Sequence, residues 1–317
     1  MRLRLPDAAV IEDPEVLDAF RGDESHVRGE RPLALVKPRS AADLRALVRA
    51  AEAEGFGLVP RGAGTGKAGG CVPTRNSVVV DMGLWPGAIT VDAADLSLSA
   101  PASAWLRDVK QAALDEGLFY PPDPNSWPLC AFGGSLATNA GGPNACKYGM
   151  TRHWVLSVDA LMADGEIHRF GIGAVKANAG PSLAQLMVGS EGIFGLIVGA
   201  TVRVIPAPKE LLTLLLPVRA WEDLLDLPAR LFGAGFLPSA FEFFDPAVLA
   251  ELRAHGPEAA RRLPGEALAI LEFDERGCTG DGFVEALADF LGPIADGLQI
   301  ASDARQREAI WAVRRDT

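Results

Sequence analysis

The chain has 317 residues, of which 49% are hydrophobic and 22% are charged, and its formal net charge is -11. Its length predicts about two domains, and its composition is that of an ordinary globular protein. The negative charge argues against nucleic acid and against an anionic membrane surface as partners, and no apolar run is long enough to span a membrane.

The first part of the chain alternates between short strands and amphipathic helices. Ser40 is a good N-cap for a helix that carries Leu44, Leu47 and Val48 on one face, and Gly55 is suited to end it. The same kind of pattern predicts a capped helix at 103–117. The full set comprises strands at 33–37, 56–60, 77–82 and 196–208, helices at 40–55 and 103–117, a short helix within 182–192 that runs into a glycine turn, and a β-hairpin at 154–170 that turns at Asp164-Gly165.

The pattern changes at about residue 209, where we expect a second domain. It predicts strands at 211–218, 239–244, 267–274 and 298–303, and helices at 221–233, from Pro246, at 282–291 and at 304–317. This alternation is typical of an α/β sandwich of ferredoxin-like character. We therefore expect an α+β protein with a first domain at 1–208 and a second at 209–317.

The stretch VPRGAGTGKAGG, residues 59–70, contains five glycines. Glycine costs backbone entropy in an ordered element, so this density indicates that a partner approaches the main chain closely. Gly64, Gly66 and Gly69 match the dinucleotide fingerprint GxGxxG. That fingerprint needs a helix that opens at the loop, and no helical pattern precedes the strand at 77–82, so the match is weak.

Two other interpretations of the cluster involve phosphate. Gly66-Lys67 is similar to part of a P-loop, but Ala68 stands where Ser or Thr should hold magnesium. A loop between two strands can instead form a nest of backbone N–H groups that cradles a diphosphate. A tight glycine turn without a ligand is the structural alternative.

Two further segments favour the nest. Residues 121–149 show little regular pattern, and the stretch at 120–142, YPPDPNSWPLCAFGGSLATNAGG, is too polar to be core. Long irregular segments inside a domain are usually functional. A third glycine turn, GSEGIFG at 189–195, carries Glu191. Three glycine-lined loops suit a long ligand with a flat ring at one end and a nucleotide at the other, and flavin adenine dinucleotide (FAD) has that shape.

Five motifs then occur in an order that resembles a known family. They are RGAGT, PPDPNS, GGSLATNAGG, KYGMTRHWVLSVDALMADGE and LMVGSEGIFGLI. Their order resembles that of the vanillyl-alcohol oxidase/p-cresol methylhydroxylase (PCMH-type) flavoproteins. NACKYGMTRHWV most resembles the branch of D-lactate dehydrogenases, D-2-hydroxyglutarate dehydrogenases and the glycolate oxidase D subunit. The resemblance covers residues 30–210 best and implies a PCMH-type FAD-binding domain of two subdomains, followed by a ferredoxin-like cap.

The resemblance also implies roles for single residues. The diphosphate is expected at Arg61, Gly62, Ala63, Gly64, Thr65 and Gly66. The flavin end is expected at Pro122, Asp123, Pro124 and Ser126. The same wall is expected to continue through Gly133, Gly134, Ala137, Asn139 and Gly142. The adenosine half or the central linker is expected near Glu191, Gly192 and Ile197.

Some features depart from the family pattern. Members that attach FAD covalently sometimes use a histidine in the first glycine loop, and residues 59–70 contain none, so we expect non-covalent FAD. Where the family usually has a threonine, this chain has Ala131. Lys67 stands where the family has a small or apolar residue, and it is either a solvated cation or a cation beside the cofactor. This branch usually runs well beyond 317 residues, so we expect the cap to lack its C-terminal part. The four histidines show no paired ligand spacing, so we expect no metal site.

The implied reaction is the oxidation of a D-2-hydroxy acid of the lactate, glycolate or 2-hydroxyglutarate type by hydride transfer to flavin N5. A planar guanidinium suits the substrate carboxylate, and AIWAVRRDT resembles the stretch where this branch places such an arginine, which points to Arg314. An exposed helix cation is the alternative for Arg314. The sequence identifies no catalytic base.

Two other functions remain open. One is an FAD-binding subunit of a glycolate-oxidase-like complex that is non-catalytic or completed by a partner. The other is a different enzyme on the same FAD module, such as an aldonolactone or alcohol oxidase or an ether-lipid synthase. The sequence also leaves open whether the chain has an electron-acceptor or iron–sulfur partner subunit, and whether it forms a homo- or hetero-oligomer.

The cysteines are scattered and match no metal or redox spacing, so we expect buried, reduced thiols. They are Cys71, Cys130, Cys146 and Cys278. Pro6 and Asp7 precede any apolar run, which argues against a signal peptide and favours a cytoplasmic location.

Overall fold

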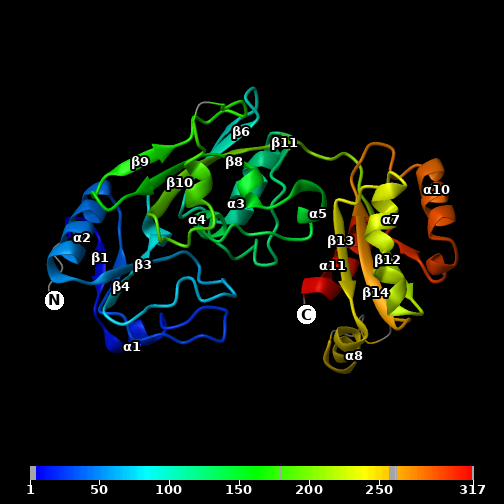
Figure 1. Ribbon diagram of the computed structural model, residues 1–317, viewed down its shortest axis with the longest axis horizontal. Helices are drawn as coiled ribbons and strands as arrows, with labels where there is room; N and C mark the ends of the chain where they lie inside the picture. The colour runs from blue at the N-terminus through cyan, green and yellow to red at the C-terminus, as the bar shows by residue number, and fades with distance from the viewer. Residues whose placement is uncertain (1–4, 179, 257–260, 262, 316–317) are drawn as a thin grey trace. The chain divides into compact units, whose positions relative to one another are not determined.

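The computed structural model describes residues 5–178, 180–256, 261 and 263–315. The chain forms two compact units (Figure 1). The first unit comprises Met1–Gly141 and Met150–Ala207, and the second comprises Gly142–Gly149 and Pro208–Thr317. None of the helices in the described ranges has the length and apolarity that a membrane span requires.

The first sheet of the first unit has four strands. In spatial order they are β1 (Ala9–Ile11), β2 (Leu35–Lys37), β4 (Ser77–Asp81) and β3 (Gly57–Arg61). β2 and β3 run parallel to β4, while β1 is antiparallel to β2. Beside them lie α1 (Pro14–Asp18) and α2 (Ala41–Glu54), and η1 (Met82–Leu84) follows β4.

The predicted helix at 40–55 is confirmed as α2. Ser40 and Asp43 form a reciprocal capping box at its start, and Gly55 ends it with a φ of 72°. Leu44 and Leu47 are buried against the sheet in one hydrophobic cluster, so the apolar face of the helix provides the core on this side.

The second sheet of the first unit is antiparallel throughout. In spatial order its strands are β5 (Thr90–Asp92), β6 (Ser97–Pro101), β10 (Leu196–Arg203), β8 (Val155–Leu161) and β9 (Ile167–Phe170). The predicted hairpin at 154–170 is confirmed as β8 and β9, with Gly165 at a φ of 80° in its turn. The described part of the unit also contains α3 (Leu106–Asp115), β7 (Leu118–Phe119), α4 (Phe132–Ala137), η2 (Thr151–His153), α6 (Ala184–Met187) and β11 (Ile205–Pro206).

The second unit is built on one four-stranded antiparallel sheet. The spatial order is β13 (Ala240–Phe244), β14 (Ala267–Phe273), β12 (Leu212–Val218) and β15 (Gln299–Ile300). In chain order this is 2-3-1-4, with helices between the strands, so the predicted ferredoxin-like alternation is confirmed. The apolar residues of the sheet lie in two hydrophobic clusters, one with η3 (Trp221–Leu224), α7 (Leu227–Gly233) and α10 (Asp281–Leu291), the other with α8 (Pro246–His255) and α11 (Ala304–Arg315). The described part of the unit also contains the short elements η4 (Gly292–Ala295) and α5 (Ala145–Tyr148).

Three local predictions were wrong. The helix at 103–117 begins only at Leu106 and has no side-chain cap, because the Ser103 hydroxyl donates to the backbone oxygen of Trp85 at 2.6 Å. The segment 121–149 contains α4 and α5, although its glycines and prolines suggested no regular structure. The helix at 221–233 is divided into η3 and α7, and Pro228 lies in the first turn of α7, where a missing N–H group is tolerated.

Candidate functional site

The first unit contains a cavity of about 650 Å³, within the size range of small-molecule and cofactor sites. Its walls come from the first glycine loop, from the 124–141 segment, from the third glycine turn and from the N-terminal segment. The predicted site residues in its lining are Arg61, Gly62, Ala63, Gly64, Thr65, Gly66, Pro124, Ser126, Gly133, Gly134, Ala137, Asn139, Glu191, Gly192 and Ile197. Three distant stretches of sequence are therefore brought together around one space.

Three predicted residues of the first domain's site are not part of that lining. Pro122 and Asp123 come just before the lining residue Pro124 in the chain. Gly142 belongs to the second unit, as does Arg314. Lys67 lines the cavity, but its side chain is 79% exposed and forms an ion pair with Glu24 at 3.6 Å, so in this structure it is mostly a solvated cation.

The first glycine loop lines the cavity and has unpaired main-chain donors in the described part of the chain. Within the part of the chain that the structure describes, the N–H groups of residues 62–66 donate no hydrogen bond to a protein acceptor. Gly64 has a φ of 77°, a conformation that favours glycine. Such a run of donors in a turn suits an anion.

Arg61 supports this loop. Its Nη1 donates to the backbone oxygen of Gly22 at 2.8 Å, and its guanidinium lies 5.1 Å from the ring centre of Phe20. A Cβ added at Gly64 would lie 2.2 Å from Arg61 Nη2, so the guanidinium packs against the Cα of Gly64. Arg61 therefore ties the glycine loop to the N-terminal part of the chain.

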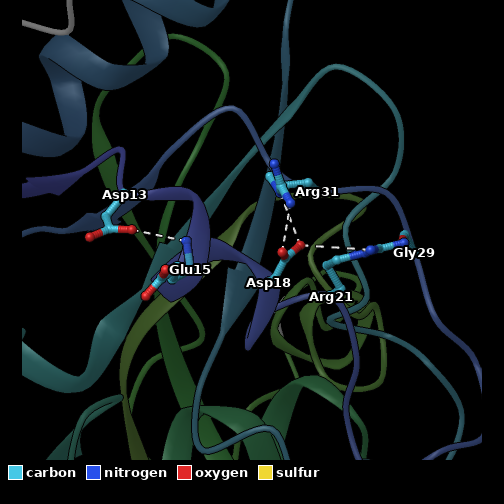
Figure 2. Close-up of polar contacts among 6 residues, drawn as sticks. All are labelled: Asp13, Glu15, Asp18, Arg21, Gly29 and Arg31. Carbon is cyan, nitrogen blue, oxygen red and sulfur yellow. Dashed lines mark hydrogen bonds and ion pairs between the residues drawn. The ribbon is translucent and has the colours of Figure 1, made fainter.

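The N-terminal loop, residues 21–31, is hydrogen-bonded to both Arg61 and Gly64. The Gly29 N–H donates to the backbone oxygen of Arg21 at 2.7 Å, and the Arg21 Nε donates to the backbone oxygen of Gly29 at 3.0 Å. The Asp18 carboxylate accepts two hydrogen bonds from Arg31, and the Arg31 hydrogen bond holds the pKa of Asp18 below its usual value (Figure 2). At the other end of the loop, the Glu24 N–H donates to the oxygen of Gly64 at 3.2 Å.

Small residues allow the 124–141 segment to lie close to the other walls of the cavity. A Cβ added at Gly62 would lie 3.0 Å from the Cβ of Ala131, and one added at Gly133 would lie 2.5 Å from the Cβ of Ala102. Larger side chains at these glycines would push the walls apart. Asn139 has a φ of 48°, and its side-chain oxygen accepts from the Arg152 N–H at 2.9 Å, which fixes the end of α4.

The third turn joins the other two segments. The N–H groups of Gly189 and Glu191 donate to the oxygens of Leu136 and Ala137, both at 3.0 Å. Glu191 has a φ of 51°, and its Oε2 would be 2.3 Å from a Cβ added at Gly70. The carboxylate of Glu191 therefore packs against the first glycine loop.

The structure corrects one expectation about the thiols. All four cysteines are free, but only Cys130 and Cys278 are buried, while Cys71 and Cys146 are half-buried. Cys71 and Cys130 line the cavity. Burial raises the pKa of Cys71, and it raises the pKa of Cys130 to about 11, so both thiols are largely protonated at neutral pH.

In the second unit, three carboxylates accept hydrogen bonds from other side chains. Arg314 Nε donates to Glu242 at 2.6 Å, and Trp311 Nε1 donates to Glu272 at 2.9 Å. The buried carboxylate of Asp274 accepts from the ammonium of Lys147 and the hydroxyl of Tyr148, both at 2.5 Å. Among the residues that can be described, no group of three or more histidine, cysteine or acidic side chains is arranged to hold a metal ion.

Two family models match the chain. A model described as an FAD binding domain matches residues 32–171, and one described as the C-terminal domain of FAD linked oxidases matches residues 207–317. The two matches follow each other in the order expected from the sequence motifs.

The chain is also similar to curated proteins. It is 32% identical to a D-2-hydroxyglutarate dehydrogenase of Xanthomonas citri pv. viticola over 95% of this chain and 64% of the relative. It is 34% identical to a D-lactate dehydrogenase of Anaerostipes hadrus over 76% of this chain and 50% of the relative. It is 30% identical to glycolate oxidase subunit GlcD of Bacillus subtilis over 78% of this chain and 52% of the relative. The chain thus spans between one half and two thirds of the length of these relatives.

One solved structure shows the fold. An alkyldihydroxyacetonephosphate synthase aligns with a TM-score of 0.77 and 20% identity, covering 96% of this chain and 60% of that chain. This likeness confirms the PCMH-type fold. A shared fold does not establish a reaction, which has to be argued from the residues of the site.

Proposed function

Because the chain belongs to the FAD-linked oxidases and its cofactor is FAD, we propose that it is an FAD-dependent oxidoreductase that oxidises a D-2-hydroxy acid. The substrate class rests on the relatives, which are named for D-2-hydroxyglutarate, D-lactate and glycolate. The observation that carries the proposal is the cavity of about 650 Å³, with the unpaired N–H groups of residues 62–66 on its wall.

The residues present fit FAD. Main-chain donors at 62–66 suit the diphosphate, which then needs no cationic side chain in this acidic protein. The segment at 124–134 offers a wall of mostly small residues for the flat ring, and Glu191, Gly192 and Ile197 line the part assigned to the adenosine half or the linker. When bound, the flavin supplies a hydride acceptor, while the protein positions the substrate.

On the substrate side we assign Arg314 to the carboxylate of the hydroxy acid. A guanidinium binds both oxygens of a carboxylate in one plane. Glu242 holds the Nε edge of this side chain and so sets its orientation. We assign no catalytic base to the described residues.

A visible spectrum of the purified chain tests the cofactor, and acid precipitation tests its attachment. We expect two flavin absorption bands and complete release of the yellow colour into the supernatant, since residues 59–70 contain no histidine. Colour that stays with the pellet would contradict non-covalent binding. A panel of D- and L-2-hydroxy acids without oxygen then tests the reaction, and bleaching by a D-isomer alone is the expected result.

A second function is favoured by one observation. The GlcD relative is named as a subunit, and the chain covers 52% of its length. The chain would then bind FAD as part of a complex, with an electron-acceptor or iron–sulfur partner. A chain that binds FAD but is bleached by no hydroxy acid, and that becomes active only with added partner protein, would favour this function.

A further inference from the structure

The Pro-rich loop, residues 120–131, forms one wall of the cavity, but its first part offers few backbone donors of its own. Pro121, Pro122 and Pro124 have no N–H group. Within the loop, the Trp127 N–H donates to the oxygen of Pro124 at 2.7 Å. This turn begins at Pro124, so the position of residues 120–123 depends on contacts with other parts of the fold.

Lys110 on α3 makes such contacts. Its Nζ donates to the oxygen of Tyr120 and to the oxygen of Pro122, both at 2.8 Å. The same ammonium group lies 5.4 Å from the ring centre of Phe119, the residue just before the loop. One side chain thus holds the loop from both sides of Pro121.

Other contacts from α3 hold the far end of the loop. The Leu106 N–H donates to the oxygen of Cys130 at 3.0 Å, and Arg107 Nη1 donates to the oxygen of Pro128 at 3.3 Å. Arg107 is exposed and its contact is long, whereas Lys110 is half-buried and its ammonium bonds to two carbonyl groups at 2.8 Å. We therefore single out Lys110.

We propose that Lys110 is a positioning residue for the cofactor site: its ammonium group keeps the Pro-rich loop in the shape that lines the cavity, and FAD binds more weakly when this charge is removed. The inference rests on the proposed placement of the flavin end beside this loop. It concerns the loop's support, because Lys110 itself is not among the lining residues.

The surroundings of Lys110 make this support sensitive to pH. Burial lowers the pKa of Lys110 to about 8, although Asp123 and Cys130, the titratable groups facing it from the loop, both act to raise it. The charge is therefore present at neutral pH and is lost as the pH rises through about 8. A neutral amine donates weaker hydrogen bonds than an ammonium group.

The test measures the dissociation constant of added FAD by quenching of its fluorescence, without substrate, between pH 7 and pH 9. For the wild-type chain we expect affinity to fall severalfold above pH 8. Lys110→Met leaves two carbonyls without a donor, and we expect about tenfold weaker binding at pH 7 and no further loss at pH 9. Lys110→Arg keeps the charge and should bind more tightly than Lys110→Met at pH 9.

Lys176→Met, at an exposed lysine of the same unit, is the matched control and should bind FAD like the wild type. Near-UV circular dichroism and thermal melting of each apo-protein show whether the variant is folded, and the wild-type pH titration needs no variant. Wild-type affinity equal at pH 7 and pH 9, or Lys110→Met affinity within twofold of wild type, overturns the inference. A wild-type chain that binds no FAD at all overturns the cofactor site itself, which is a distinct result.

Discussion

Glu242 on β13 and Arg314 on α11 form a half-buried ion pair in which the Arg314 Nε donates to the Glu242 carboxylate at 2.6 Å. Their side chains are 25% and 28% exposed, so the pair is only partly screened by solvent. The carboxylate contact at Nε restricts how the guanidinium can turn. An arginine held in this way is suited to present its planar fork to a second carboxylate.

We therefore predict that Arg314→Lys raises the KM for the hydroxy acid. Lysine cannot reproduce a two-point contact, and the loss of a charge-assisted hydrogen bond of about 1.5–3 kcal/mol corresponds to about tenfold or more in KM. FAD affinity should stay unchanged. Steady-state kinetics with Arg305→Lys, an exposed position on the same helix, serve as the control. If the KM of Arg314→Lys were unchanged, the role of Arg314 would be structural and would not include substrate binding.

The two central glycines of the first loop differ in what an added methyl group would meet. At Gly64 the backbone has a φ of 77°, and a Cβ would lie 2.2 Å from Arg61 Nη2. At Gly66 no left-handed φ is required, and the nearest atom to a Cβ would be Asp23 Oδ2 at 3.7 Å, an ordinary contact. Only the first substitution strains the backbone and displaces the arginine.

We predict that Gly64→Ala weakens FAD binding by about tenfold, since a non-glycine residue in this conformation costs about 1–2 kcal/mol. Gly66→Ala should bind FAD within about threefold of wild type, because a Cβ there meets only an ordinary contact. Fluorescence titration measures both, and melting curves of the apo-proteins report any loss of folding. Equal losses in the two variants would show that the loop does not hold the diphosphate in the described conformation.

The framework of the fold could be predicted because its signals are local. Ser40 and Gly55 mark the two ends of α2, and Asp164-Gly165 marks the hairpin turn. These residues act within a few positions of themselves, so their effect is visible in a single stretch of sequence. The glycine turns were equally visible in the sequence, and residues of three predicted segments line one cavity.

The support of the site could not be predicted in the same way. Asp23 and Glu24 line the cavity, and Lys110 holds its wall, but each acts on residues that no periodic pattern links to it. The Glu24 contact with Gly64 spans 40 positions and is made by a backbone N–H, which any residue type except proline could supply. α4 escaped prediction because Gly133 and Gly134 lower helix propensity, while packing against Ala102 favours the helix in the folded chain.

Residues Gly142–Gly149 belong to the second unit, and the pair of Lys147 with Asp274 helps to hold them there. Only 3% of the Asp274 side chain is exposed. Removing its charge leaves the Lys147 ammonium without its counter-ion in a partly buried place, a change that costs about 3 kcal/mol or more. We predict that Asp274→Asn lowers the stability of the second unit by about that amount, measured by urea unfolding.

Asp296→Asn is the control for this prediction. Asp296 pairs with Arg219 in the same unit, but the two side chains are 63% and 87% exposed, so its loss should cost less than about 1 kcal/mol. If both variants unfold at the same urea concentration, the Lys147–Asp274 pair does not hold α5 in place.

The half-buried thiols allow the cofactor site to be probed without substrate. Cys71 lines the cavity, whereas Cys146 lies in the second unit outside the cavity lining. Burial raises the pKa of both thiols, so the reactive thiolate is scarce at neutral pH and alkylation should accelerate as the pH rises.

We predict that iodoacetamide modifies both residues slowly at pH 7 and faster at pH 9, and that saturating FAD slows the reaction of Cys71 alone. Peptide mass spectrometry after timed quenching measures each rate, with Cys146 as the internal reference. If FAD left the Cys71 rate unchanged while the flavin was bound, the cofactor would have to lie away from the first glycine loop.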